Sequence, residues 1–261
     1  MNTPDHSHEQ PDLSIVIPLL NEAESLPELY QQVLTALEPT GKSFEILFID
    51  DGSRDGSFEI IRRMREGDKR IRAIQFRRNC GKSAALAVAF EAVRGEVVVT
   101  MDSDLQDDPG EVPAMIVHLE EGYDLVSGWK QKRQDPITKT LPSKLFNWVT
   151  GWVSGLRLHD FNCGLKAYRR EVVETIPVYG DLHRYLPVLA HWSGFRVTER
   201  PVQHHPRKYG TSKFGIGRFT HGLFDLLTVY FVSNYTRRPL HLFGSFGLLS
   251  FGIGFGFAMY L

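Results

Sequence analysis

The chain has 261 residues, of which 42% are hydrophobic and 23% charged, and its formal net charge at pH 7 is −1. This composition excludes a wholly disordered chain. The near-neutral charge gives little support to nucleic-acid binding through general phosphate neutralisation, so any anion site must be local.

The start of the chain is polar and carries no apolar signal sequence. We expect residues 1–12 to form a disordered tail in which His6 and His8 are solvated. The two cysteines, Cys80 and Cys163, have no CxxC spacing, which favours a domain facing a reducing compartment. We interpret both cysteines as buried small hydrophobic residues.

From residue 13 onwards, apolar β-branched runs alternate with stretches of helical period. The predicted strands are Leu13–Pro18, Phe44–Ile49, Ile71–Phe76 and Glu96–Met101, and the predicted helices are Ala23–Leu37, Ser57–Glu66 and Ser83–Val93. This alternation predicts an α/β fold, a Rossmann-like and mostly parallel sheet flanked by helices. In such sheets the ligand binds beyond the carboxyl ends of the strands.

Acidic residues follow the first two strands. The sequence PLLNE, from Pro18 to Glu22, closes the first strand, and Asp50 and Asp51 close the second. Carboxylates at these positions can accept hydrogen bonds from a ribose or a base, and Gly52 permits a tight exit turn. The alternative is that the aspartates only build a turn and that Glu22 only begins a helix.

Gly81, Lys82 and Ser83 follow a strand and open a helix, as the end of a phosphate-binding P-loop does. The glycine that a P-loop requires five positions before Gly81 is replaced by Phe76, so we reject that interpretation. Lys82 can still offer a cation to a diphosphate, or it can be an ordinary surface lysine.

The strongest local signal is the pair Asp102 and Asp104 after the apolar run EVVVTM. In an extended segment both side chains point to the same side, and Gln106 can follow them. Two carboxylates at the ligand edge of a sheet suit Mg²⁺ or Mn²⁺, so we predict a metal site. A solvated acidic turn is the alternative, because Asp107 and Asp108 follow directly.

The end of the chain is different in kind. Residues Leu240 to Leu261 carry no charge and, at about 20 residues, reach the length that crosses a bilayer core. We predict a transmembrane segment at 239–261, with a buried core helix as the alternative. Basic residues precede the segment, so the positive-inside rule places the preceding domain in the cytoplasm. The apolar run stops without a polar flank, which suggests a shortened sequence or a further span.

Two other stretches are predicted to lie on a membrane surface. Region 214–238 is expected to be a juxtamembrane amphipathic helix, with aromatic and leucine residues at helical spacing from Phe214 to Phe231 and core packing as the alternative. Leu145 to Val153, with Trp148 and Trp152, is a second candidate because tryptophan is favoured at headgroup depth.

The ordered set PLLNE, IDDGSRDGS, RNCGKSAAL and MDSDLQDDP resembles the family 2 glycosyltransferases, which have the GT-A fold. The resemblance covers residues 13–213 and implies a GT-A catalytic domain there. Two later elements, DFNCGLK from Asp160 and RKYGTSK from Arg207, are similar to those of the polyprenyl-phosphate glycosyltransferases. That branch includes dolichol-phosphate mannose synthases and bacterial undecaprenyl-phosphate glucosyltransferases.

The resemblance implies roles for individual residues. The implied catalytic residues are Asp102, Asp104 and Asp160, and the implied metal ligands are Asp102, Asp104 and Gln106. The implied nucleotide contacts are Pro18, Glu22, Asp50, Asp51, Lys82 and Asp102, and the implied phosphate or acceptor contacts are Arg133, Lys144, Arg207, Ser212 and Lys213. Where the family often has an arginine, this chain has Gly128, Trp129 and Lys130, which leaves Lys130, Lys132 and Arg133 as alternatives for one anion contact.

The implied reaction is an inverting transfer in which the metal and nearby cations neutralise the leaving diphosphate. A lipid monophosphate acceptor is largely ionised at neutral pH and needs little help from a base. We therefore expect Asp160 to position the acceptor or take a residual proton, with a turn or helix cap as the alternative. His204 and His205 are interpreted as structural.

The expected function is transfer of glucose from UDP-glucose to undecaprenyl phosphate at the cytoplasmic face of the inner membrane. A GDP-mannose-dependent polyprenyl-phosphate mannose synthase and a transferase acting on a polysaccharide hydroxyl are alternatives. A membrane-tethered nucleotide-binding module without catalysis is a third. The sequence leaves homo-oligomerisation open.

Overall fold

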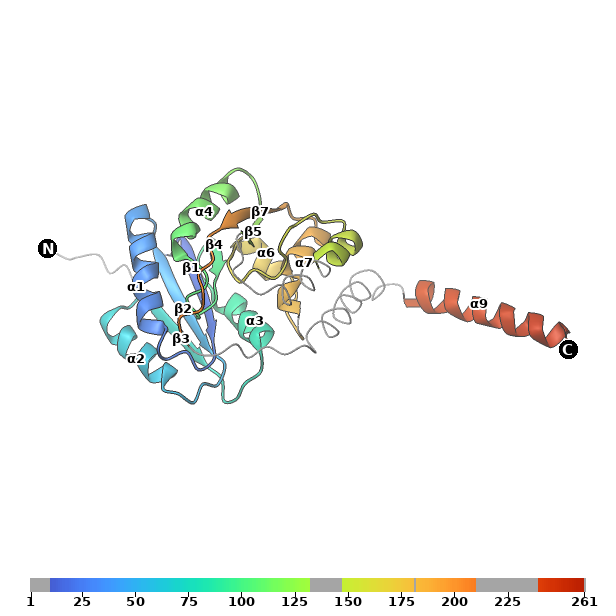
Figure 1. Ribbon diagram of the computed structural model, residues 1–261, viewed down its shortest axis with the longest axis horizontal. Helices are drawn as coiled ribbons and strands as arrows, with labels where there is room; N and C mark the ends of the chain where they lie inside the picture. The colour runs from blue at the N-terminus through green and yellow to red at the C-terminus, as the bar shows by residue number, and fades with distance from the viewer. Residues whose placement is uncertain (1–9, 132–146, 181, 210–238, 261) are drawn as a thin grey trace. The chain divides into compact units, whose positions relative to one another are not determined.

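The computed structural model describes residues 10–131, 147–180, 182–209 and 239–260 (Figure 1). The chain divides into two compact units, Met1–Gly215 and Ile216–Leu261. The predicted juxtamembrane region 214–238 lies outside the described residues. Asp12, which we expected in the disordered tail, belongs to the fold, because its carboxylate accepts hydrogen bonds from the Ser43 N–H and hydroxyl, each at 2.7 Å.

The first unit is built on a seven-stranded sheet of order β3-β2-β1-β4-β6-β5-β7. The strands are β1 (Leu13–Leu19), β2 (Phe44–Asp50), β3 (Ile71–Gln75), β4 (Val97–Thr100), β5 (Leu125–Lys130), β6 (Lys166–Arg169) and β7 (Val197–Val202). Strands β1 to β4 pair in parallel, as do β5 and β7, whereas β6 runs antiparallel to both β4 and β5. The α/β prediction is therefore confirmed, with one reversed strand that the sequence did not reveal.

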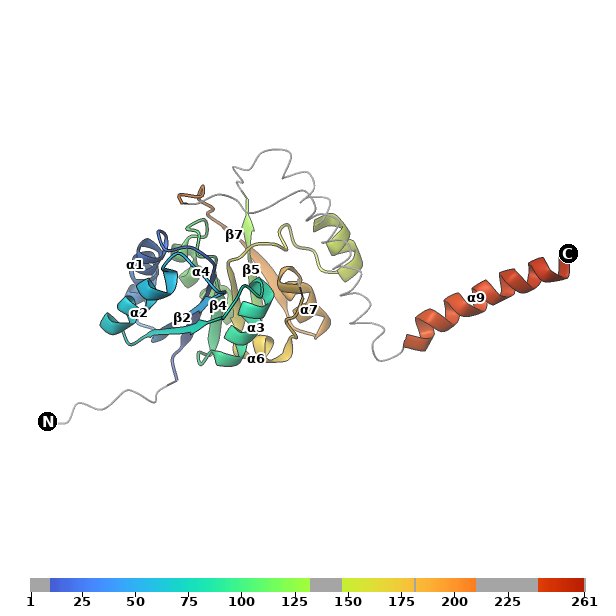
Figure 2. The same cartoon turned by 90° about the horizontal axis from the view of Figure 1, so that it is seen from below.

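Helices cover both faces of this sheet (Figures 1 and 2). The helices are α1 (Leu26–Leu37), α2 (Ser57–Gly67), α3 (Lys82–Ala92), α4 (Val112–Glu120), α6 (Arg170–Thr175) and α7 (Leu186–Trp192). Short 3-10 helices are η1 (Glu38–Thr40), η2 (Pro109–Glu111) and η3 (Leu182–Arg184), and residues 147–154 are also helical. Helix α1 contacts α2 and α4 on one face, and α3 contacts α6 on the other.

The first helix begins at Leu26 rather than at the predicted Ala23. Proline at the start of a helix is favourable because its fixed φ suits the first turn and its missing N–H needs no partner there, and Pro27 occupies that position. The residues before it form a turn in which the Ser25 N–H donates to the Glu22 carbonyl at 3.2 Å. This turn leaves Glu22 at the carboxyl edge of the sheet.

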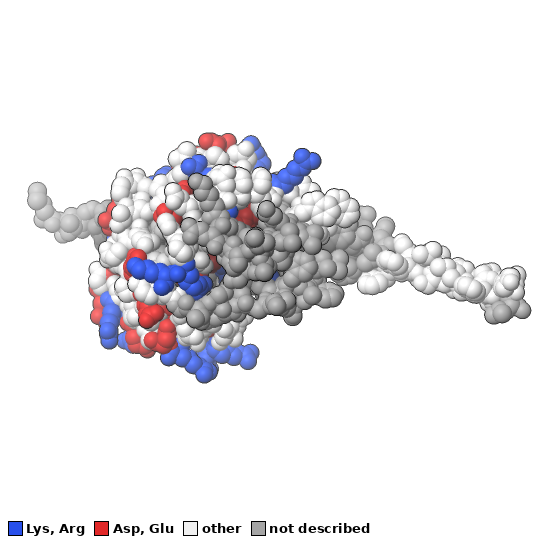
Figure 3. Space-filling view, in the orientation of Figure 1, with Lys and Arg blue, Asp and Glu red and all other residues white. Residues whose placement is uncertain are grey.

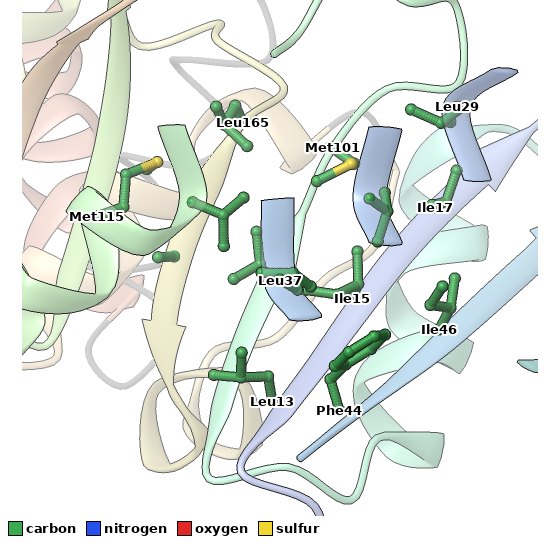
Figure 4. Close-up of a cluster of buried hydrophobic side chains, with 14 of the residues drawn as sticks. Leu13, Ile15, Ile17, Leu29, Leu37, Phe44, Ile46, Met101, Met115 and Leu165 are labelled. Atoms are coloured by element: carbon green, nitrogen blue, oxygen red, sulfur yellow. The ribbon is translucent and has the colours of Figure 1, made fainter. Parts of the chain in front are cut away.

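The core lies against the central strands. Strands β1 and β2 are buried along their whole length, which explains why their sequences are mostly apolar instead of alternating. Figure 4 shows Ile15 and Ile17 of β1 and Ile46 of β2 in one cluster with Leu29 and Leu37 of α1. Full burial of such a side chain contributes about 1.5–3 kcal/mol, so this cluster stabilises the packing of α1 on β1 and β2.

The second unit contains α9 (Pro239–Tyr260), a 22-residue apolar helix. Within it, residues Phe243–Tyr260 have a mean hydropathy of 1.4 and none of this window is buried. By length and composition α9 is a candidate membrane span, as the sequence predicted for this part of the chain.

The start of β1 passes very close to Gly95. A Cβ at Gly95 would lie 2.5 Å from the Leu13 carbonyl carbon and 2.5 Å from the Ser14 nitrogen, so the Gly95→Ala substitution must push backbone apart. We expect a loss of about 1–3 kcal/mol. The control Gly67→Ala, in α2, meets no atom within 4 Å and should be neutral or stabilise by up to about 1 kcal/mol. Thermal unfolding of both full-length variants in detergent measures the difference, and equal midpoints would contradict it.

Candidate active site

Asp50 and Asp51 organise two loops at the carboxyl edge. The Asp50 carboxylate accepts from the Ser53 N–H at 2.9 Å and from the Gln75 amide at 3.0 Å. The Asp51 carboxylate accepts from the Cys80 N–H at 2.6 Å and from the Gly81 N–H at 2.9 Å. All four carboxylate oxygens thus hold backbone or side-chain donors of the protein, in agreement with the turn-building alternative for these residues.

Asp51 also fixes the amino end of α3. Its carboxylate binds the Cys80 N–H, and the Cys80 thiol is exposed, so the prediction that Cys80 is buried is wrong. Gly52 has a φ of +78° and an added Cβ would lie 2.6 Å from the Arg78 carbonyl carbon, so the two loops touch at this glycine. The consequence is a fixed position for Lys82, the first residue of α3.

The loop after β1 is joined to the loop after β2. The Asn21 N–H donates to the Ser53 hydroxyl at 2.8 Å, and the Asn21 side chain accepts from the Arg54 N–H at 2.8 Å. Asn21 takes a left-handed φ of 54°, which asparagine tolerates well. Pro18 is buried within β1, opposite Ile49. Sequence reasoning missed Asn21, although Asn and Ser are frequent in turns.

Asp102 and Asp104 each meet a basic side chain from a distant part of the chain. The Lys82 ammonium group donates to the Asp102 carboxylate, and the Arg207 guanidinium donates to Asp104 Oδ2 at 2.5 Å. Arg207 also lies 3.7 Å from Glu22 Oε1. The structure therefore brings together five of the residues singled out from the sequence.

The extended backbone expected from Asp102 to Gln106 is not present. Strand β4 ends at Thr100, and Leu105 has a φ of 60°, so the chain turns between Asp104 and Gln106. The Gln106 N–H donates to Asp104 Oδ1 at 3.2 Å, and its side-chain amide donates to the His205 carbonyl at 3.4 Å. Gln106 is thus close to the acid pair for a different geometric reason from the predicted one.

The two aspartates differ in proton affinity. Burial raises the pKa of Asp102, but the positive charges of Lys82 and Lys130 outweigh burial and hold the pKa below its usual value. Burial, together with the negative charge of Asp102, raises the pKa of Asp104 above its usual value despite Arg207. The repulsion between the two negative charges therefore disfavours the charged form of Asp104, and a bound cation would reduce this repulsion.

A glycine lies directly against the acid pair. An added Cβ at Gly164 would be 2.6 Å from Asp102 Oδ2 and 2.8 Å from Asp107 Oδ2, so only glycine fits there without displacing a carboxylate. The Gly164 carbonyl accepts from the Thr100 hydroxyl at 3.0 Å, which ties its loop to the end of β4. Gly164 belongs to the motif DFNCGLK, and residue spacing alone does not predict its contact with Asp102.

The reversed strand β6 explains how Gly164 arrives there. Because β6 is antiparallel to β4, the loop that precedes it lies at the same edge as the carboxyl end of β4. That loop contains Asp160, which is 1% exposed and accepts from the Asn162 N–H at 3.0 Å. The bond supports the turn alternative for Asp160 while leaving the residue within the site.

Two lysines, the partly buried Lys130 and the buried Lys166, balance acidic groups near the pair. Lys130 Nζ lies 3.3 Å from Asp107 Oδ1, and the Lys166 ammonium donates to the Cys163 carbonyl. Burial lowers the pKa of Lys166. Burial also raises the pKa of the Cys163 thiol to about 12, so this cysteine is an inert buried residue, as predicted. On the face of the molecule that Figure 3 shows, acidic and basic side chains are interspersed.

His183, in η3, is a residue that sequence reasoning missed. Its Nδ1 lies 2.9 Å from the Ser83 hydroxyl, beside Lys82. Burial, with the charge of Lys82, lowers the pKa of His183 to about 2, so the imidazole is neutral at physiological pH. No spacing in the sequence connects residue 183 with residue 83.

The segment after β7 returns across the site. The His205 N–H donates to the Gln106 carbonyl at 2.9 Å, and His204 pairs with Asp107 in an isolated β-bridge. Lys208 Nζ then binds Glu28 Oε2 of α1 at 2.7 Å. These contacts on both sides of Arg207 hold its guanidinium over Asp104.

The donor set fits a hard divalent cation. The described residues hold no group of three or more His, Cys, Asp or Glu side chains that could cage a metal ion. Mg²⁺ and Mn²⁺ suit a pair of carboxylates completed by phosphate oxygens and water, and Asp102 with Asp104 provides that pair. Arg133, Lys144, Ser212 and Lys213 lie outside the described residues, as does Lys132.

Comparison with known proteins agrees with this geometry. The model of the family Glycosyl transferase family 2 matches residues 14–176. The chain is 37% identical over 243 residues to dodecaprenyl-phosphate galacturonate synthase of Rhizobium johnstonii, covering 91% of this chain and 72% of that protein. It is 38% identical over 236 residues to undecaprenyl-phosphate 4-deoxy-4-formamido-L-arabinose transferase of Salmonella typhimurium, covering 90% and 71%.

Two solved structures share the fold at lower identity. A mannosyltransferase from Pyrobaculum calidifontis, in complex with GDP-Man and Mn²⁺, has a TM-score of 0.61 at 21% identity, covering 88% of this chain and 65% of that one. Glucosyl-3-phosphoglycerate synthase from Mycobacterium tuberculosis, in complex with Mn²⁺, UDP and phosphoglyceric acid, has a TM-score of 0.65 at 19% identity, covering 84% and 78%. The family model and the sequence relatives together show that this chain belongs to the family 2 glycosyltransferases, and its sheet has the GT-A fold.

Proposed function

We propose that the protein transfers a sugar from a nucleoside diphosphate to a polyprenyl phosphate at a membrane surface, with the help of Mg²⁺ or Mn²⁺. The observation that carries the proposal is the acid pair: Asp102 and Asp104 lie at the ligand edge with a basic side chain on each. The names of the relatives, which include dodecaprenyl-phosphate and undecaprenyl-phosphate transferases, support a lipid phosphate acceptor. The apolar helix α9 supports a membrane location.

The chain's own residues suit a diphosphate leaving group. When bound by Asp102 and Asp104, with Gln106 beside them, a divalent cation supplies a Lewis acid for that group. Lys82 and Arg207 now neutralise the acid pair and can exchange those carboxylates for phosphate oxygens as the donor enters. Lys82 also stands at the amino end of α3, where backbone N–H groups favour an anion.

The acceptor needs little activation. Its phosphate monoester is largely ionised at neutral pH, with a second pKa of about 6, so its oxygen can attack the anomeric carbon directly and invert the configuration. Asp160 then serves to position the acceptor or to take a residual proton. We place the catalytic domain at 13–213 on the cytoplasmic side, with 214–238 as the juxtamembrane region and 239–261 as the span.

The sugar is the least constrained part of the proposal. UDP-glucose stays a candidate, and the relatives' names add galacturonate and 4-deoxy-4-formamido-L-arabinose. The deciding experiment incubates the full-length protein in detergent with Mn²⁺, polyprenyl phosphate and radiolabelled sugar nucleotides, including GDP-mannose. We expect one donor to label the lipid, whereas label on a hydroxyl acceptor would reject the lipid assignment.

Metal removal tests the acid pair directly. Because the diphosphate leaves only when its charge is neutralised, EDTA should abolish sugar transfer, and excess Mn²⁺ should restore it. The measurement is the initial rate of glycolipid formation before and after chelation. Glycolipid formation at full rate under thorough chelation would show that the pair binds no essential metal.

Asparagine substitutions compare how much Asp102 and Asp160 contribute to the rate of transfer. Asp102→Asn removes a charge at the metal site and should lower kcat on the order of 100-fold or more. Asp160→Asn retains the hydrogen bond to the Asn162 N–H and should lower kcat by only about tenfold, since the acceptor is already ionised. Steady-state kinetics of the two variants decide the ranking, which is wrong if both lose the same activity.

Gly164→Ala tests the approach of the loop to the metal site. The added methyl group displaces the Asp102 or Asp107 carboxylate, so the Mn²⁺ concentration for half-maximal rate should rise about 10- to 100-fold. The Gly67→Ala variant, which meets no neighbour, should keep the wild-type Mn²⁺ dependence. An unchanged Mn²⁺ dependence in Gly164→Ala would place the metal elsewhere.

A further inference from the structure

The helix at residues 147–154 exposes large apolar side chains and buries small polar ones. Trp148 is 68% exposed and Trp152 is 79% exposed, and their spacing of four residues puts both on one side of the helix. On the opposite side, Thr150 is fully buried and Ser154 is 5% exposed. A helix that faces water shows the reverse arrangement, with polar groups outside and apolar groups inside.

The outward position of the tryptophans is enforced by the fold. The Trp192 indole N–H of α7 donates to the Ser154 carbonyl at 3.1 Å, which fixes the inner side of the helix. At the first described residue of the helix, the Asn147 amide donates to the His159 carbonyl at 2.6 Å. An added Cβ at Gly151 would lie 3.2 Å from the Leu156 carbonyl oxygen, so the following loop packs closely against the helix.

The chemistry of this face fits the headgroup region of a bilayer. A tryptophan side chain carries a large apolar area and one polar N–H, and it is enriched at the membrane–water interface. The side of the helix opposite the tryptophans packs on the domain, so a contact of Trp148 and Trp152 with a bilayer must lie parallel to its surface. Arg157, exposed just after the helix, supplies a cation for lipid phosphates.

The helix leads directly into the candidate active site. Residues 155–159 connect it to Asp160 and to the loop that presses Gly164 against Asp102. His159 in this connection stacks on Trp129 of β5, with ring centroids 4.1 Å apart. A surface contact at Trp148 and Trp152 is therefore linked by a short segment of chain to residues beside the acid pair.

We propose that Trp148 and Trp152, with Arg157, dock on the headgroup layer of the membrane and form a lipid contact separate from α9. This inference rests on the proposed function for its purpose, which is to hold the acceptor side of the site close to a phosphate at the bilayer surface. The contact of Trp148 and Trp152 with lipid can be measured without any enzymatic activity.

The first test is fluorescence quenching in lipid nanodiscs. The 261-residue chain has four tryptophans. In nanodiscs whose lipids carry bromine near the top of the acyl chain, part of their emission should be quenched. In the double variant Trp148→Ser/Trp152→Ser that quenched part should disappear. The control Val117→Ser, which removes another exposed apolar side chain from α4, should show wild-type quenching. Equal quenching in the double variant and the wild type would overturn the proposal.

The second test separates docking from catalysis. The double variant should raise the KM for polyprenyl phosphate in a bilayer on the order of three- to tenfold, because the face contributes binding area. The KM for the sugar nucleotide and the rate with a short, water-soluble prenyl phosphate should stay unchanged. Trp148→Tyr/Trp152→Tyr should restore the bilayer KM, since tyrosine is also favoured at the interface.

The outcomes distinguish the two proposals. An equal loss with the water-soluble acceptor would mean that the substitutions disturb the site itself, and docking would be rejected. If no prenyl phosphate of either kind is a substrate, the proposed function fails, while bromine quenching that depends on Trp148 and Trp152 would still establish the lipid contact.

Discussion

Two carboxylates held close together at one edge of the sheet are the constraint on which the site depends. Burial, together with the negative charge of Asp102, raises the pKa of Asp104, so keeping both carboxylates charged is costly. The fold offsets this cost with Lys82 from one side and Arg207 from the other. Both cations arrive from segments far away in the sequence, so the charge balance of the site requires the whole domain to be folded.

Much of the surrounding structure can be understood as support for those two cations. Asp51 binds the backbone at Cys80 and Gly81 and thereby fixes the start of α3, where Lys82 lies. The segment carrying Arg207 is held by hydrogen bonds at His205 and Lys208. In the proposed function, Lys82 and Arg207 exchange the carboxylates of the acid pair for phosphate oxygens. This exchange would couple donor binding to metal binding, because the two side chains leave the metal-binding carboxylates when they bind the donor.

The reversed strand gives the site its second half. Had β6 been parallel, the loop containing Asp160 and Gly164 would lie at the opposite edge of the sheet, away from Asp102. Its antiparallel direction instead brings that loop, which follows the helix that carries Trp148 and Trp152, to the ligand edge. One change of strand direction thus brings the acid pair and the chain that leads from the proposed lipid contact to the same site.

The sequence by itself determined the α/β class, the apolar helix at the end of the chain and the acidic residues that close β2 and follow β4. These features are local: continuous apolar runs specify buried strands, and the residues after a strand lie at its end. Only the tertiary structure decided that Asp51 holds a loop, that Leu105 turns the chain before Gln106 and that Cys80 is exposed. The pairing of Lys82 and Arg207 with the aspartates and the contact of Gly164 also appear only there, because they depend on strand order and direction, which residue spacing does not specify.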